Sequence, residues 1–130
     1  MLEGPHSYSL FAPGTAAAPK VCRDFVRSAL TASDMGHLAE TAAFCASELA
    51  ANVHQHARSD IHLRLAVTPT HVRVGVYDGD PTLPTPRRAG ETDTSGRGLF
   101  LVTALSDACG VCDNGTGKGV WFELRNGDRA

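Results

Sequence analysis

Several features are missing from this chain of 130 residues, and each absence excludes a class of protein. Residues 1–20 contain no basic start followed by a long apolar stretch, so we expect neither a signal peptide nor a membrane span, and a cytoplasmic location. The formal net charge of -2 provides no electrostatic footprint for nucleic acid, so no direct binding to nucleic acid is expected. The chain also lacks internal repeats and a G-x-x-x-x-G-K-[ST] phosphate loop.

Cysteine is scarce, with four residues at positions 22, 45, 109 and 112. Cys109 and Cys112 have C-x-x-C spacing, but no second pair or nearby histidine completes a set of zinc ligands, because Cys22 and Cys45 fall on predicted helices. We interpret the cysteines as small buried apolar residues. A regulatory redox pair at Cys109 and Cys112 is the alternative.

The remaining composition fits one compact domain over residues 1–130. With 42% hydrophobic residues, the chain can bury a core without disulfides or metals. Apolar periodicity predicts a mixture of strands and helices, hence an α/β chain folded as a two-layer α+β sandwich. Strands are expected at 6–11, 61–67 and 72–77. Helices are expected at 19–34, from the residue after Asp34 to about residue 58, and at 99–108. Two further strands, joined by a hairpin turn at Asn114-Gly115, are expected to follow.

Residues 79–95 are expected to form no packed element. They contain three prolines and two glycines but few apolar residues. We interpret this segment as a mobile lid, within which Arg87 and Arg88 are able to reach a phosphate or to remain solvated. The N-terminal part, about 1–18, is interpreted as a strand with a tail.

The segment 48–57 carries the first chemical signal. Glu48, Asn52 and His56 recur at intervals of four, which builds one polar stripe on a helix whose other residues are largely apolar. The stripe overlaps the arc that faces the core, and a half-buried carboxylate is costly unless a polar group, a metal or a ligand meets it. The helix is therefore expected to form the wall of a site, with His56 as either a ligand contact or a structural helix end.

Two later segments supply partners for this wall. The strand 72–77 runs into Asp78 and Gly79, which places a carboxylate at a strand end beside a turn. Gly96, Arg97 and Gly98 then precede the apolar residues from Leu99 onwards, and a glycine-rich helix start presents amides and the positive end of the helix dipole to an anion. Together these segments predict a nucleotide site.

In this order and spacing the motifs resemble the GHKL-type ATPases, whose fold gyrase and histidine kinases share. The similarity is greatest to the small stand-alone anti-sigma-factor serine/threonine kinases, whose first motif E-L-x-x-N-x-x-x-H-A is matched by Glu48, Leu49, Asn52, His56 and Ala57. Residues 117–124, G-K-G-V-W-F-E-L, resemble the last strand of that family. The resemblance implies a Bergerat-type fold, a mixed, mostly antiparallel sheet covered on one face by about three helices.

The resemblance also implies roles for the site residues. Asn52 would bind a Mg²⁺ that bridges the phosphates of ATP, Glu48 would act as general base, and Asp78 would accept a hydrogen bond from the adenine amino group. Gly79 belongs to the same motif as Asp78. The glycine box Gly96, Arg97 and Gly98, with Leu99, would close over the phosphates. One amide oxygen suits Mg²⁺, which prefers oxygen ligands and keeps several waters.

Two positions depart from the family pattern. Asp80 adds a second acid beside the expected adenine pocket, and Gly119 stands where the family carries a threonine or serine whose hydroxyl supports the aspartate. Loss of one such hydrogen bond is expected to cost on the order of 1 kcal/mol, or about fivefold in affinity.

Two functions follow from the resemblance. The first is an ATP- and Mg²⁺-dependent serine/threonine kinase and anti-sigma factor that sequesters a sigma factor and phosphorylates a STAS-type anti-anti-sigma protein. Because members of the family often dimerise through the sheet, a homodimer is implied as well. The second is a catalytically inactive regulatory module, either ATP-binding or degenerate and nucleotide-free, that controls a partner by binding. A detached catalytic domain of a sensor histidine kinase ranks third, because the chain has no dimerisation helix bearing a phosphoacceptor histidine.

Overall fold

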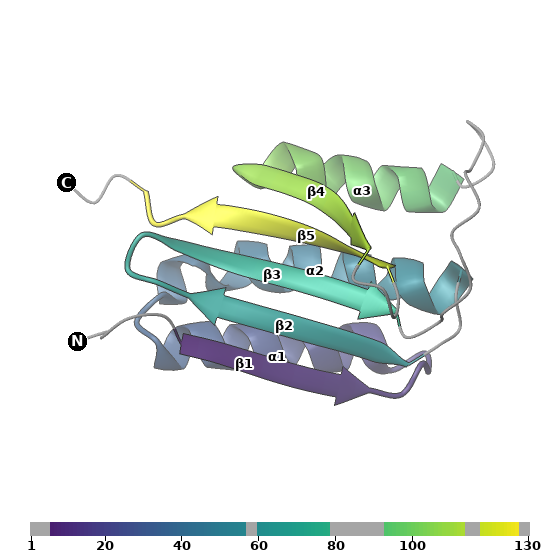
Figure 1. The fold of residues 1–130 in the computed structure, drawn as a ribbon, viewed down its shortest axis with the longest axis horizontal. Coiled ribbons are helices and arrows are strands. Elements are labelled where there is room, and N and C mark those ends of the chain that lie inside the picture. Colours follow the sequence, from purple (N-terminus) through teal and green to yellow (C-terminus); the bar gives the residue numbers. More distant parts are fainter. Residues whose placement is uncertain (1–5, 57–59, 79–92, 114–117, 128–130) are drawn as a thin grey trace.

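The computed structural model describes residues 6–56, 60–78, 93–113 and 118–127, and the strands in these ranges form one five-stranded sheet. The sheet has the order β1-β2-β3-β5-β4, and each neighbouring pair is antiparallel (Figure 1). The α+β sandwich predicted from the sequence is confirmed. The strands are β1 (His6–Ala12), β2 (Ile61–Val67), β3 (His71–Asp78), β4 (Ala108–Asp113) and β5 (Lys118–Arg125).

The helices are α1 (Ala18–Ala32), α2 (Gly36–His56) and α3 (Asp93–Leu105). Figure 1 shows α1 and α2 behind the sheet, with α3 alongside β4. We call the sheet face turned towards α1 and α2 the inner face and the opposite face the outer face. The alternation of buried and less buried residues along β2 gives the reason for this layering, since each strand turns every second side chain towards the helices.

Helix α1 is bounded by local sequence signals. Pro19 lies in its first turn, where the missing N–H is no loss. At its end, Asp34 adopts a left-handed backbone with φ of 63°, and the amide of Met35 donates a 2.8 Å hydrogen bond to the carbonyl of Leu30. The amide of Asp34 also bonds the carbonyl of Thr31, which completes a Schellman motif. This motif reverses the chain into α2, and the buried side chain of Met35 fixes the turn to the core.

The core lies between the helices and the inner face. Its fully buried large side chains come from α1, α2, α3 and the three central strands: Leu30, Val26, Leu49, Val102, Ile61, Leu63, Leu65, Val67, Val72, Val74, Val76 and Phe122. This cluster contains residues from both halves of the sequence. The division of the chain into one domain over residues 1–130, with a strand and tail at 1–18 and a lid at 79–95, stays a prediction.

Two predicted boundaries are wrong. The third helix was expected at 99–108 but is Asp93–Leu105, so residues 93–95 of the predicted lid belong to α3, and 79–92 lie outside the described residues. At the end of the helix, the Ser106 hydroxyl and amide both bond the carbonyl of Val102, at 2.7 and 3.0 Å. The Asp107 amide then donates to the Glu123 carbonyl, and the chain continues as β4.

The remaining elements lie where the sequence predicted them, within one or two residues. Strands β4 and β5 pair with each other as expected for a hairpin, whereas Asn114 and Gly115 themselves lie outside the described residues. In the part of the chain described here, no helix is long and apolar enough to cross a membrane.

Candidate nucleotide site

The wall of the predicted site is formed by α2. Glu48 and Asn52 lie one turn apart on this helix and are both half-buried. Because the alanine-rich flanks are small, α2 approaches β3 and α3 closely, and both elements contact it. A carboxylate and an amide are thereby held side by side at the margin of the core.

Asp78 is the last residue of β3. It is 8% exposed, and its register partner on β2 is Ile61, whose side chain is buried on the inner face. By the alternation of β3, Asp78 shares this inner face with Val74 and Val76. The chain therefore directs a buried carboxyl group from the strand end towards the helix layer.

The other predicted residues belong to α3 or follow α2. Gly96, Arg97 and Gly98 lie in the first two turns of α3, and Leu99 next to them is partly exposed. His56 is the final residue of α2, and Gly79 lies outside the described residues. Figure 1 shows that the C-terminal ends of α2 and β3 and the N-terminal end of α3 gather at one end of the molecule.

The elements that carry Asn52, His56, Asp78 and the glycine box therefore meet at one end of the fold. Their joint binding of a nucleotide stays a prediction. The helix start differs, however, because α3 begins three residues before Gly96. In a regular helix only the first four amides lack an intrahelical partner. Counted from the N-cap, these four amides end at residue 95, so the amides of Gly96, Arg97 and Gly98 all lie beyond them. Closure of the glycine box over a phosphate would therefore require the first turns of α3 to open.

Packing in the structure explains why residue 119 is a glycine, which the sequence did not reveal. Its register partner is Tyr77, so these two residues share the outer face, whereas Asp78 points to the inner face. A Cβ atom built on Gly119 would collide with the Tyr77 ring and would lie 2.7 Å from the carbonyl oxygen of Val76. The expectation that a hydroxyl at 119 would support Asp78 is therefore wrong, because a side chain there points to the other face of the sheet.

Cys45 is a neighbour of the site that sequence reasoning treated only as packing. It lies three residues before Glu48 on α2 and is fully buried. Burial raises the pKa of its thiol to about 11, and the charges of Glu48 and Cys109 act in the same direction. The i, i+3 spacing to Glu48 was the sequence signal for this proximity. A thiol with so high a pKa is protonated at neutral pH and unreactive.

Both cysteines of the C-x-x-C pair lie on β4. Cys109 faces Phe122 across the β4–β5 register, and its thiol lies 3.6 Å from the hydroxyl of Thr103. No group of three or more His, Cys, Asp or Glu side chains able to hold a metal occurs among the described residues. A redox role for Cys109 and Cys112 stays a prediction.

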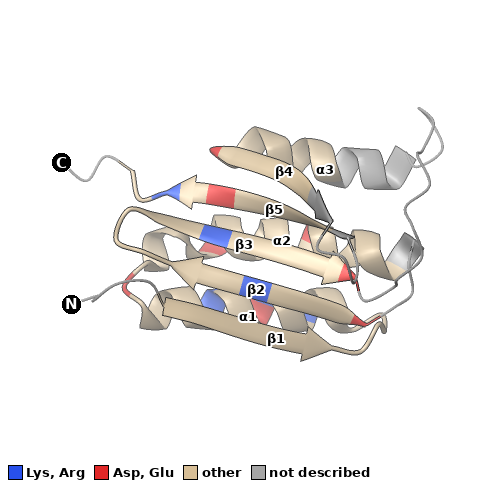
Figure 2. Cartoon of the chain, in the orientation of Figure 1, with Lys and Arg blue, Asp and Glu red and all other residues tan. Residues whose placement is uncertain are grey.

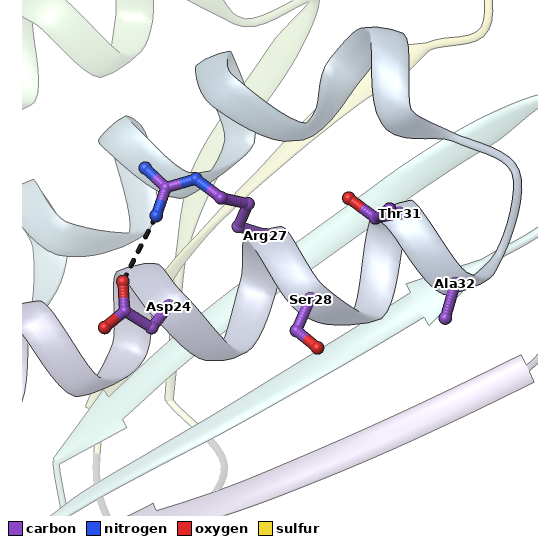
Figure 3. A pocket seen from close by; sticks show the side chains of 5 residues that line it. All are labelled: Asp24, Arg27, Ser28, Thr31 and Ala32. Atoms are coloured by element: carbon purple, nitrogen blue, oxygen red, sulfur yellow. Dashed lines mark hydrogen bonds and ion pairs between the residues drawn. The ribbon is translucent and has the colours of Figure 1, made fainter.

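A hollow of about 540 Å³ lies on α1, away from the predicted site. Figure 3 shows its five lining side chains, all from α1. The guanidinium of Arg27 is already engaged, since it bonds Asp24 at 3.1 Å and makes two bonds to Glu40 of α2 at 2.7 and 3.0 Å. The one cation among the described residues that line this hollow is therefore already paired.

Comparison with known proteins identifies the class to which this fold and this site belong. The sequence profile of the histidine kinase-like ATPase domain matches residues 12–124. These residues include all three helices and the strands β2, β3 and β4 in full, β5 up to Leu124, and only the last residue of β1. The chain belongs to this family. It is similar to an uncharacterised protein of Streptomyces coelicolor, SCO4941, with 43% identity over 73 residues, covering 54% of this chain and 70% of that protein.

Membership of this family supports ATP binding, and the donor set is compatible with it. Asp78 offers a buried carboxyl group, as recognition of an amino group requires, and the amide oxygen of Asn52 is a hard ligand of the type that Mg²⁺ takes. Mg²⁺ in nucleotide sites is usually held by one or two protein oxygens together with phosphates.

Proposed function

We propose that this protein is an ATP-binding anti-sigma factor with serine/threonine kinase activity. The observation that carries the proposal is the placement of Glu48 and Asn52, half-buried on α2, at the margin of a core that also holds the carboxyl group of Asp78. Membership of the histidine kinase-like ATPase family supports the nucleotide. Glu48, at the position of the general base in the anti-sigma-factor kinases that this motif resembles, favours the kinase branch.

Each residue has a distinct proposed role. Asp78 accepts a hydrogen bond from the base of the nucleotide, and Asn52 holds Mg²⁺, which neutralises phosphate charge when bound. Glu48 removes the proton from the attacking serine or threonine hydroxyl. Phosphoryl transfer needs mostly positioning and charge stabilisation, so this small set, with Arg97 and the amides of the glycine box, is sufficient. His56 and Leu99 contribute contacts to the nucleotide.

The proposed partners are proteins. A sigma factor is the protein sequestered, a STAS-type anti-anti-sigma protein is the phosphoryl acceptor, and a second copy of this chain completes a homodimer. These partners rest on the resemblance of the Glu48–Ala57 motif to the anti-sigma-factor kinases.

Calorimetric titration with ATP tests the nucleotide site. We expect saturable binding that requires Mg²⁺ in the wild type and is lost in Asn52→Ala and in Asp78→Asn. Ser28→Ala, an exposed change on α1, is the control and should bind as the wild type does. Absence of binding at millimolar ATP would reject the nucleotide site.

Phosphoryl transfer tests the catalytic role. Glu48→Gln is expected to lower transfer to the anti-anti-sigma protein by about a hundredfold or more, because a general base contributes on that scale. Glu40→Gln is the matched control, since Glu40 lies on the same helix but is exposed and bonded to Arg27. Normal transfer by the Glu48 variant would remove it as the base.

The alternative is a binding module without catalysis. Asp80 is the observation that favours it, because a second acid beside the adenine pocket opposes phosphate. Gly119 no longer supports it, since this glycine is explained by packing against Tyr77. The alternative predicts no phosphoryl transfer to any antagonist, whether or not ATP binds, and observed transfer would reject it.

A further inference from the structure

The outer face of the sheet is a second surface with a definite chemistry. Among the described elements no helix covers it, and Figure 1 shows α1 and α2 on the opposite side. Three consecutive cross-strand rows make up its centre. Starting from the end of the molecule that holds Asp78, the rows are Phe11-His62-Tyr77-Gly119, Ser9-Arg64-Gly75-Trp121-Gly110 and Ser7-Ala66-Arg73-Glu123-Ala108.

The glycines in these rows make the surface flat. A Cβ atom at Gly75 would lie 2.6 Å from the Tyr77 hydroxyl oxygen, and one at Gly110 would lie 2.9 Å from the Trp121 ring. Together with Gly119, these positions leave space for the two large rings to lie down on the sheet. A flat surface with tyrosine, tryptophan and arginine at its centre has the composition of a protein interface core.

An apolar side chain is exposed to solvent at the edge of the outer face. Phe11 of β1 is 73% exposed, although it stacks on His62 with ring centroids 4.2 Å apart. The Nε2 atom of His62 is buried and has no hydrogen-bond partner among the residues that the structure describes. An exposed phenylalanine held rigid by a neighbouring ring loses little entropy on binding and is a suitable anchor for a partner.

The charge of the face is predominantly positive. Figure 2 shows basic positions on β2, β3 and β5, and these are Arg64, Arg73 and Arg125. Glu123 is the single acidic residue described on the outer face of these strands, and it is paired with His71 at 3.1 Å. The face thus combines three guanidinium groups with apolar rings, in a chain whose net charge is -2.

We propose that the outer face is a docking surface for a different protein, one that presents carboxylates around an apolar side chain. Carboxylates would meet Arg64 and Arg125, and the apolar group would pack beside Phe11 and Tyr77. Complementary charge of this kind speeds association and selects the partner. This surface lies on the face opposite to Glu48 and Asp78, so the proposal does not depend on ATP binding.

Charge and ring geometry favour this occupant over two others. A second copy joined through the same face would bring three more arginines and only one more glutamate, which leaves like charges opposed. The homodimer proposed above would therefore form through another part of the chain. Stacking of nucleic acid bases requires free ring faces. Here the guanidinium carbon of Arg73 lies 3.9 Å from the centroid of the Trp121 ring, and Phe11 and His62 face each other.

The fluorescence of Trp121 reports directly on this surface, because it is the single tryptophan of the chain. The probe is a short peptide of alternating glutamate and leucine, titrated into the full chain at low salt. The matching peptide of lysine and leucine and an oligothymidylate are titrated in parallel. The test variant is the double substitution Arg64→Glu/Arg125→Glu, which keeps Arg73 over the tryptophan ring. The control variant is Arg23→Glu on α1. Circular dichroism verifies that both variants are folded.

We expect a saturable change with the acidic peptide that weakens by about tenfold or more in the double variant, persists in the Arg23 variant, and falls as salt rises. No saturable change with the acidic peptide, or an equal change in the folded double variant, would overturn the proposal. Tighter binding of the oligothymidylate would assign the face to nucleic acid instead. Sedimentation showing a dimer that is lost in the double variant would assign it to a second copy.

Discussion

At the scale of single residues, Gly119 shows how a departure from a family pattern can have a packing cause. Its nearest side chain is Tyr77 on the neighbouring strand, and both lie on the outer face. A larger residue at 119 therefore displaces a ring and approaches a backbone carbonyl, while it remains remote from the carboxyl group of Asp78.

Restoration of the family residue by Gly119→Thr is accordingly expected to lower the free energy of unfolding by about 1–3 kcal/mol, the usual cost of overpacking. It is not expected to tighten ATP binding. Urea unfolding and calorimetry measure the two effects. Gly36→Thr is the control, because nothing lies within 4 Å of a Cβ atom at Gly36. A gain in ATP affinity at unchanged stability would contradict the assignment of Gly119 to the outer face.

His62 gives the fold a dependence on pH. Burial lowers its pKa below the usual value of about 6.5, and the charge of Arg64 lowers it further. The folded state therefore binds fewer protons at this site than the unfolded state. The stabilising contribution is present above the ordinary histidine pKa and is lost as the pH falls below it.

Titration of the His62 ring protons by NMR should give a pKa below that of a histidine in an unstructured peptide. Urea unfolding should show a loss of stability between neutral pH and the acid side of that value, and His62→Phe should reduce this loss. A ring that titrates at or above the ordinary value would refute the effect.

At the scale of elements, the α1–α2 connection depends on a short local motif. Asp34 adopts the left-handed conformation that glycine favours, and the amides of Asp34 and Met35 close the end of α1. The bidentate Arg27–Glu40 pair then joins the two helices on their exposed side. The hydrogen bond from Arg27 lowers the pKa of Glu40, and the main benefit of the pair is orientation, since exposed ion pairs add little stability.

Asp34→Gly is expected to raise the free energy of unfolding by about 0.5–1 kcal/mol, because glycine adopts a positive φ without strain. Thermal or urea unfolding measures the change. The comparison variant is Thr31→Gly in the last turn of α1, where glycine should instead destabilise by up to about 1 kcal/mol. Destabilisation by Asp34→Gly would show that the aspartate side chain has a role that its backbone does not reveal.

At the scale of the whole molecule, the layers share one core. The buried cluster contains Val26 of α1, Leu49 of α2, Val102 of α3 and Phe122 of β5, so no pair of layers can separate without exposing the others. Its continuity favours a single cooperative unfolding transition.

Phe122→Ala should lower the free energy of unfolding by about 3–5 kcal/mol, since it removes a large, fully buried side chain. The transitions followed by Trp121 fluorescence and by far-ultraviolet circular dichroism should still coincide. Leu105→Ala, at a position 46% exposed, is the control and should cost much less. Two separate transitions would contradict a single core.

Much of the fold was determined by the sequence itself. Alternation along 61–67 and helical spacing along 48–56 predicted β2 and α2 because burial of one face imposes a period on apolar residues. The motif around Glu48 and Asn52 predicted the family. Its polar residues lie at helix positions where the apolar period predicts buried side chains, as a binding site requires.

Other features were decided only by tertiary structure. Helix α3 ends where the Asp107 amide bonds the carbonyl of Glu123, and the lack of a side chain at Gly119 leaves room for the Tyr77 ring. Glu123 and Tyr77 both lie on strands. Whether a residue at 119 faces Asp78 or the opposite side depends on strand register, where one step changes the face. The basic and aromatic outer face likewise arises from four strands that the sequence keeps apart. Local periodicity therefore determined the elements, whereas contacts between distant segments decided what each face presents.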